Sequence, residues 1–181
     1  MEVRLIFKIL LLILSIGKCN AQKTEPFYEQ IAFDFYSNQI LKEIPVNKKI
    51  TVAKELNYTK SIHYLPSDCL KNKIENKKNA NDINIAKHIS DLKIKKYELD
   101  LSKTNRNQFR VIKKLNVNDR GLINHKNSIF LYKPKLFEER VFVIIDQVLE
   151  SNGTVYTIEL DKKGNIIDWC KSSEYEQLII E

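Results

Sequence analysis

The 181-residue chain has only four glycines, three histidines and three cysteines. The scarcity of glycine fits the absence of a P-loop and of a Rossmann glycine pattern, both of which need glycine to bring backbone close to phosphate. Gly-x-Ser-x-Gly and His-Glu-x-x-His motifs are also missing. Because His63, His88 and His125 show no ligand spacing with a cysteine, we predict no metal site and no cofactor. The sequence therefore contains none of these signatures, which mark the enzyme classes that are easiest to recognise from sequence.

Arginine is scarce, whereas lysine and asparagine are abundant, and the formal net charge is +7. Without the first 21 residues, Lys+Arg falls to 30 − 3 = 27 and Asp+Glu to 23 − 1 = 22, so the rest carries +5. This charge is spread along the chain and forms no basic stripe interleaved with aromatic residues. We therefore predict that nucleic acid is not a partner.

Residues 1–21, MEVRLIFKILLLILSIGKCNA, have the pattern of an export signal. Arg4 and Lys8 precede a short apolar run over 9–17, which is shorter than the roughly 20 apolar residues that span a bilayer. The remaining 160 residues, 22–181, are enough for a single domain with a core. We expect an exported protein of the periplasm or the extracellular space.

Two routes of processing fit this signal. Small residues at −3 and −1 would let signal peptidase I cut after Ala21, so that the mature chain begins at Gln22. Lipoprotein processing would instead cut before Cys19 and acylate it, which would anchor the protein to the envelope, although Lys18 stands where a small residue is expected. An uncleaved anchor is the third alternative.

Two cysteines remain once Cys19 is assigned to the signal. In an oxidising compartment, Cys69 and Cys170 form a candidate disulfide. It would close a loop of about 100 residues and stabilise the fold by on the order of 4 to 5 kcal/mol in the chain-entropy model. The alternative is two separately buried thiols.

An apolar stripe at helical spacing predicts a helix over residues 25–44, with its stripe facing the core. Pro26 suits the first turn, and Pro45 ends the run. The members of the stripe are Phe27, Ile31, Phe35, Ile40, Leu41 and Ile44.

The middle of the chain predicts short elements separated by polar segments. The lysine- and asparagine-rich stretch 71–81 has too few apolar groups to order itself and predicts a mobile surface loop. A one- or two-turn helix is predicted over 174–180. The other predicted elements are strands at 49–53, 97–101, 109–115 and 128–133, and a short helix at 83–92.

The C-terminal third predicts three strands, at 140–150, 154–161 and 166–170. Asn152-Gly153 and the turn at 162–165 separate them, and Asn-Gly between apolar runs is a strong hairpin signal. The predicted class is therefore α+β, with an N-terminal helix packed on an antiparallel sheet that ends in a three-stranded meander.

Counting residues across these turns gives a register. Leu149 would face Tyr156 and Ile158 would face Trp169, on an apolar side covered by the helix. On the other side Asp146, Glu159 and Asp168 would stand in a row across three strands. Like charges placed opposite one another are destabilising, so the row either serves as acid, base or cation ligand, or is neutralised on a solvated face.

The stretch SIFLYKPKLFEERVFVIIDQVLESNGTVYTIELDKKGNIIDWC, residues 128–170, resembles the C-terminal portion of small uncharacterised exported proteins and lipoproteins of Gram-negative bacteria. In those proteins a strand ending in proline precedes a strand–turn–strand ending in tryptophan, as Pro134 and Trp169 do here. Some members resemble cystatin-like or nuclear-transport-factor-2-like folds. The resemblance implies a helix cradled by a curved sheet and implies no catalytic residues.

Three functions follow from these patterns. The first is an exported non-enzymatic domain that binds a protein or small ligand in the cell envelope, for instance as an immunity protein or inhibitor. The second is a hydrolase-type enzyme that uses the row of Asp146, Glu159 and Asp168. The third is an oligomer assembled through its sheet.

Overall fold

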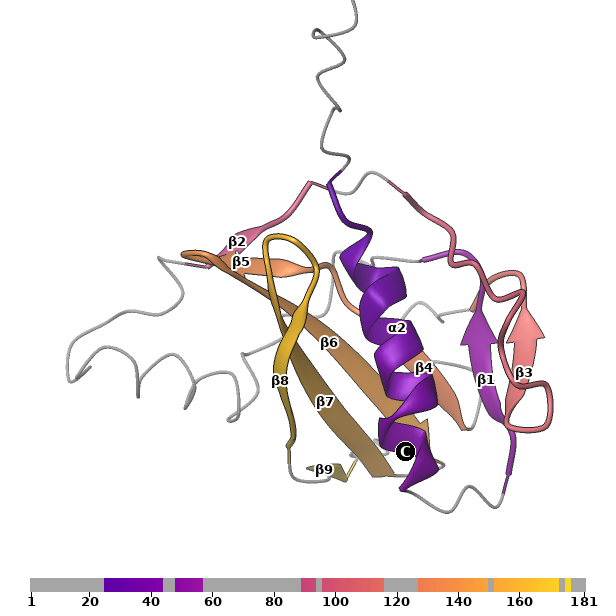
Figure 1. The fold of residues 1–181 in the computed structure, drawn as a ribbon. Helices are drawn as coiled ribbons and strands as arrows, with labels where there is room; N and C mark the ends of the chain where they lie inside the picture. Colours follow the sequence, from indigo (N-terminus) through magenta and orange to yellow (C-terminus); the bar gives the residue numbers. More distant parts are fainter. Residues whose placement is uncertain are drawn as a thin grey trace, which may run out of the picture.

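The computed structural model describes residues 25–43, 48–56, 89–93, 96–115, 127–149, 152–172 and 175–176. These residues have an α+β fold, as the sequence predicts. The helix α2 (Tyr28–Asn38) is followed by a 3-10 turn, η1 (Ile40–Lys42), and lies across one face of a sheet (Figure 1). In this view β8 lies on one side of the helix, and β1 and β3 lie on the other.

Nine strands of the described residues form one mixed sheet. The long strands β6 and β7 pair at its centre; β8 and β9 pair with β7, while β5 and β4 pair with β6, and β1 and β3 continue the sheet beyond β4. The strands are β1 (Ile50–Ala53), β2 (Ser90–Asp91), β3 (Phe109–Ile112), β4 (Ser128–Leu131), β5 (Lys135–Phe137), β6 (Arg140–Leu149), β7 (Asn152–Asp161), β8 (Ile166–Lys171) and β9 (Tyr175–Glu176).

The prediction of a wholly antiparallel sheet is wrong at β1, which runs parallel to both β3 and β4. Parallel neighbours need long connections, whereas tight turns join antiparallel ones. β1 ends at Ala53, and its neighbours begin only at Phe109 and Ser128, so the chain has room for such crossovers. A prediction based on short turns does not find this pairing.

The helix buries a different face from the one predicted. Its deepest residues are Tyr28, Ala32, Phe33 and Tyr36, which pack against the central strands. Because Phe27, Ile31 and Phe35 lie on the flank of that face, they are only half-buried. The α-helical part ends at Asn38, and Ile40 and Leu41 of η1 are buried as expected.

The opposite side of the sheet carries its own buried apolar groups. Phe137, Phe142, Ile144 and Val155 form a cluster there. Strand β6 therefore packs on both faces, which explains its continuous run of apolar residues.

Several smaller predictions differ from the structure. Residues 90–91 form β2 instead of the end of a helix, and 175–176 form β9 instead of helix. In place of a strand at 97–101 there is one bridge, between Glu55 and Glu98. The predicted loop 71–81 and the signal 1–21 lie outside the described residues. No helix within the described ranges is long and apolar enough to cross a membrane.

Candidate functional site

The predicted row of three carboxylates is only partly formed. In the β6–β7 pair Leu149 faces Asn152, and Asp146 faces Val155. The predicted register is thus wrong by four residues, because Asn152 and Gly153 belong to the strand and pair their backbone groups instead of forming the turn. Because the register shifts by an even number of residues, the side chains predicted to lie on one face of the sheet still lie on that face.

The second hairpin keeps two of its predicted pairs. Glu159 faces Asp168, and Ile158 faces Trp169. A bulge then moves Leu160 opposite Ile166. Since Asp146 is displaced along the strands by four residues from Glu159, roughly 13 Å of strand separates the two.

Each carboxylate has surroundings of its own. Asp146 is buried, and its Oδ2 accepts a hydrogen bond from the Tyr132 hydroxyl at 3.3 Å. Glu159 is also buried, and its Oε1 lies 3.4 Å from the guanidinium of Arg140. Asp168 is exposed and accepts the backbone N–H of Trp169 at 2.8 Å. Asp146 and Glu159 therefore have different partners, and the register separates them, so the three groups do not share one reaction centre.

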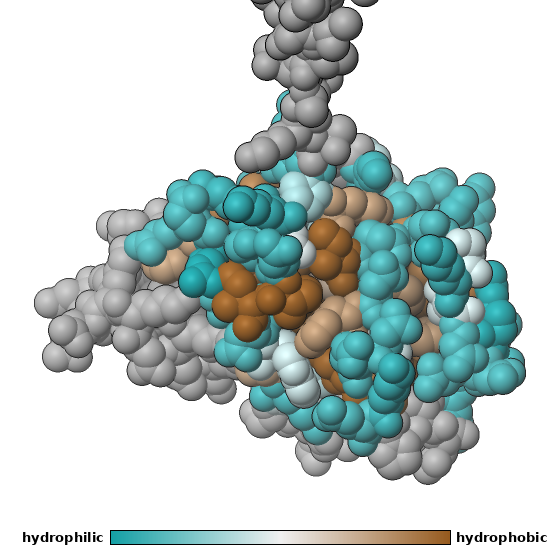
Figure 2. Space-filling view, viewed as in Figure 1, coloured by the Kyte–Doolittle hydropathy of each residue, from teal (hydrophilic) through white to brown (hydrophobic). Residues whose placement is uncertain are grey.

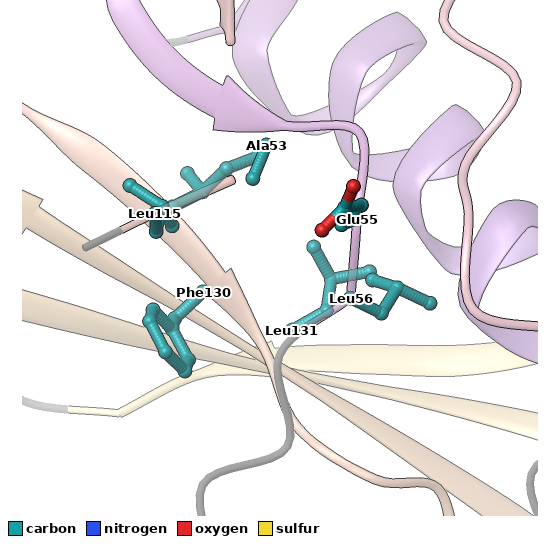
Figure 3. Close-up of a pocket in the computed structure, with 7 residues that line it drawn as sticks. Ala53, Glu55, Leu56, Leu115, Phe130 and Leu131 are labelled. Atoms are coloured by element: carbon teal, nitrogen blue, oxygen red, sulfur yellow. The ribbon is translucent and has the colours of Figure 1, made fainter. Parts of the chain in front are cut away.

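A small cavity lies where β1 and β4 diverge (Figure 3). Its volume is about 20 Å³, which is about the room that one water molecule needs. Apolar side chains form most of its wall, with the Glu55 carboxylate at one side. This cavity is too small for a substrate.

The segment 161–165 is a turn, as its composition predicts. The Asp161 carboxylate accepts the backbone N–H groups of Lys163 and Asn165, both at 2.8 Å, and the Asn165 amide at 2.8 Å. The hydrogen bonds from Asn165, followed by that from Lys163, lower the pKa of Asp161. Within the described residues, no group of three or more His, Cys, Asp or Glu side chains is placed to hold a metal ion.

An apolar patch lies on the surface between α2 and β8. Figure 2 shows brown and tan side chains gathered there, with hydrophilic residues around them. Ile31 and Phe35 of the helix flank, and Ile166 and Trp169 of β8, are half-buried against the core. Ile167, next to them in β8, is 41% exposed. We call these five residues the α2–β8 patch.

Aromatic rings of the core support Trp169 in this patch. The rings of Tyr36 and Tyr156 are edge-to-face at 5.2 Å, and Trp169 lies against Tyr156 at 6.4 Å. The turn before β8 carries exposed Lys162 and Lys163 beside the patch, and Lys162 is paired with Glu139 at 2.7 Å. The sequence does not distinguish this patch from the core, because the helical spacing of its apolar residues predicts that the whole stripe is buried.

Cys170, on the opposite face of β8 from Trp169, is disulfide-bonded. Cys19 and Cys69 both lie outside the described residues. The pairing of Cys170 with Cys69 therefore stays a prediction, as does acylation of Cys19.

In the part of the chain that the structure describes, fold and surface together define a small α+β domain with a helix over its sheet and an apolar patch beside that helix. In comparisons with known proteins, no family model, no curated protein and no solved structure matches the chain. The resemblance to exported Gram-negative proteins, and to cystatin-like or nuclear-transport-factor-2-like folds, stays a prediction.

Proposed function

We propose that this chain is an exported, non-enzymatic domain that acts by binding another protein through the α2–β8 patch. The observation that carries the proposal is the pair of half-buried aromatic residues Trp169 and Phe35 within one apolar surface that hydrophilic residues surround. Patches of this kind mark protein interfaces, and buried aromatic anchors contribute most of the binding energy in them. An immunity or inhibitor role is one form that such binding takes.

The positive charge of the chain indicates what kind of partner fits the patch. Exposed Lys163 stands beside the patch, next to Lys162, which pairs with Glu139, and the chain after residue 21 carries +5. Complementary charge steers association and suppresses wrong partners. The partner that fits is therefore an acidic protein of the envelope or the extracellular space, which places an apolar or aromatic side chain on the patch.

The hydrolase alternative has less support. It needs Asp146, Glu159 and Asp168 in one row, and the register separates Asp146 from the other two.

Two exposed apolar residues allow a matched test. Ile167 is 41% exposed within the patch, and Tyr97 is 61% exposed outside it. Baits of residues 22–181 carrying Ile167→Asp or Tyr97→Asp are compared with wild type for capture of a protein from envelope extract. We expect the captured protein to be acidic and to bind Tyr97→Asp normally. Its affinity for Ile167→Asp falls about tenfold or more, which is about 1.4 kcal/mol.

Three outcomes contradict the proposal. Equal binding of both variants would show that the patch is not the interface. A basic partner whose binding does not weaken with salt would exclude the charge argument. A wild-type dimer that Ile167→Asp converts to monomer would instead support the sheet-mediated oligomer.

Mass spectrometry of the mature N-terminus tests export, distinguishing Gln22 from an acylated Cys19.

A further inference from the structure

A second surface lies on the other flank of α2. There the helix, η1 and the segment 100–108 enclose an open cavity of about 410 Å³. This volume falls within the range of small-molecule sites. Its lining residues are Asp34, Ser37, Asn38, Lys42, Asp100, Lys103, Thr104, Asn105, Gln108 and Phe109.

Hydrogen bonds hold the walls of this cavity in place without a ligand. The Gln30 side chain accepts the N–H of Asp100 at 2.7 Å, and it donates to the Asp100 carbonyl at 3.1 Å and to the Asp34 carboxylate at 2.9 Å. It thereby ties the helix to the segment 100–108. Within that segment the Asn105 carbonyl accepts N–H groups of Gln108 and Phe109 at 3.1 and 2.9 Å. A preformed wall reduces the ordering cost of binding.

The charges of the lining are balanced and come from different elements. Asp34 projects from the helix and Asp100 from the facing segment, while Lys42 belongs to η1 and Lys103 to the segment. Burial, together with repulsion from Asp100, raises the pKa of Asp34, although Gln30 and Lys103 oppose this rise. An ammonium group between two carboxylates stabilises both in their charged form.

The remaining lining suits a small polar molecule. The Asn38 and Gln108 amides supply neutral donors and acceptors, and Phe109 lies at the buried end. The Ser37 hydroxyl donates to the Asp34 carbonyl at 3.1 Å, which leaves its oxygen as an acceptor. Phe109 is fixed there by edge-on packing with Phe33 at 5.7 Å. A net-neutral ligand with separated charges is complementary to two carboxylates and two ammonium groups.

We propose that this cavity binds a small zwitterion of the amino acid or dipeptide class. Its ammonium group lies at Asp34 and Asp100, and its carboxylate lies at Lys42 and Lys103. The site is distinct from the α2–β8 patch and does not depend on the function proposed for it.

The first test uses three dipeptide probes with the chain 22–181. Binding of alanyl-alanine, its N-acetyl form and its C-terminal amide is measured by amide chemical shifts and by calorimetry. We expect free alanyl-alanine to shift the amides of Gln30, Asp100 and Ser102, and each blocked form to bind about tenfold more weakly. No shift at these amides with free dipeptide, or equal binding of the blocked forms, would overturn the proposal.

The second test changes one charge without changing shape. Asp34→Asn removes the negative charge that the ligand ammonium needs, and we expect it to weaken alanyl-alanine binding about tenfold. Asp91→Asn is the matched control, because Asp91 is an exposed carboxylate of β2 that pairs with Lys133 and Lys135 and does not line the cavity. Unchanged affinity in Asp34→Asn, or an equal loss in both variants, would contradict the assignment.

Discussion

At the scale of single residues, Tyr36 and Gln147 form a buried polar pair between helix and sheet. Tyr36 is fully buried, and its hydroxyl donates to the Gln147 side-chain oxygen at 2.9 Å. Burial, and to a lesser extent Tyr156, raises the pKa of Tyr36 well above its usual range. The bond fixes the helix relative to β6, because both partners lack water around them.

Removing this hydroxyl leaves a buried acceptor without its donor. We predict that Tyr36→Phe lowers the free energy of unfolding by about 1 to 3 kcal/mol. Urea denaturation followed by circular dichroism measures this change. Tyr97→Phe, at an exposed position, is the control and is expected to remain within about 0.5 kcal/mol of wild type. Equal stability of the two variants would show that the buried bond contributes nothing.

Gly164 is a position where a side chain is not accommodated. Its φ is +87°, and a Cβ built there would lie 2.7 Å from Ile31 Cδ1 and 3.1 Å from Pro26 Cβ. We predict that Gly164→Ala destabilises the fold by about 1 to 3 kcal/mol, through backbone strain and displacement of the helix start. Thermal and urea unfolding of Gly164→Ala and of its exposed neighbour Lys163→Ala would separate this effect from simple loss of turn polarity. A larger loss in Lys163→Ala would contradict it.

At the scale of elements, the β7–β8 hairpin joins the sheet to the helix. Its turn is held by Asp161, and the Tyr28 hydroxyl donates to the Lys162 carbonyl at 3.0 Å. Gly164 brings the same turn against Ile31. The hairpin therefore positions the β8 half of the α2–β8 patch beside the helical half.

The turn makes stability dependent on pH. The pKa of Asp161 is lowered in the folded protein, whereas the unfolded chain has the ordinary value of about 3.9. The stability that the charged Asp161 carboxylate contributes is fully present above the unfolded-state pKa, and it is lost as pH falls through the lowered pKa of the folded protein. We predict that wild type loses more stability than Asp161→Asn between about pH 5 and about pH 3.

Urea midpoints across this range provide the measurement. Other shifted carboxylates, such as Glu98 and Asp100, are common to both proteins, so the difference between them isolates Asp161. Parallel pH profiles would show that the turn bonds do not depend on the charge of Asp161.

Element prediction succeeded where the pattern is local. The turn at 162–165 and the pairs Ile158–Trp169 and Glu159–Asp168 follow from residue counting and are present. Counting residues predicted correctly which side chains of β6 and β7 share a face, because side chains alternate along a strand. It predicted the wrong pairing between the two strands, because the pairing depends on Asn152 and Gly153 belonging to β7.

At the scale of the whole molecule, Cys170 is disulfide-bonded. We predict that Cys170 pairs with Cys69, closing a loop of about 100 residues. Under non-reducing conditions, peptide mapping should join the peptides that contain these two cysteines. Replacing both by serine is expected to lower the free energy of unfolding by on the order of 4 kcal/mol. A bond from Cys170 to Cys19, or unchanged stability, would contradict the prediction.

Both proposed surfaces use the helix that covers the sheet. One flank carries Ile31 and Phe35 toward β8, and the other carries Asp34 toward Asp100. The polar cavity has no sequence signal, because its two acidic residues belong to segments far apart in the chain.

The sequence by itself determined the α+β class, the helix near the N-terminus and the turn at 162–165, because helical spacing and turn residues act over a few positions. It also determined the net positive charge. Only the tertiary structure decided that β1 pairs in parallel, that Asp146 stands apart from Glu159, and which flank of the helix stays at the surface. These features depend on packing between residues distant in the chain, which local patterns do not encode.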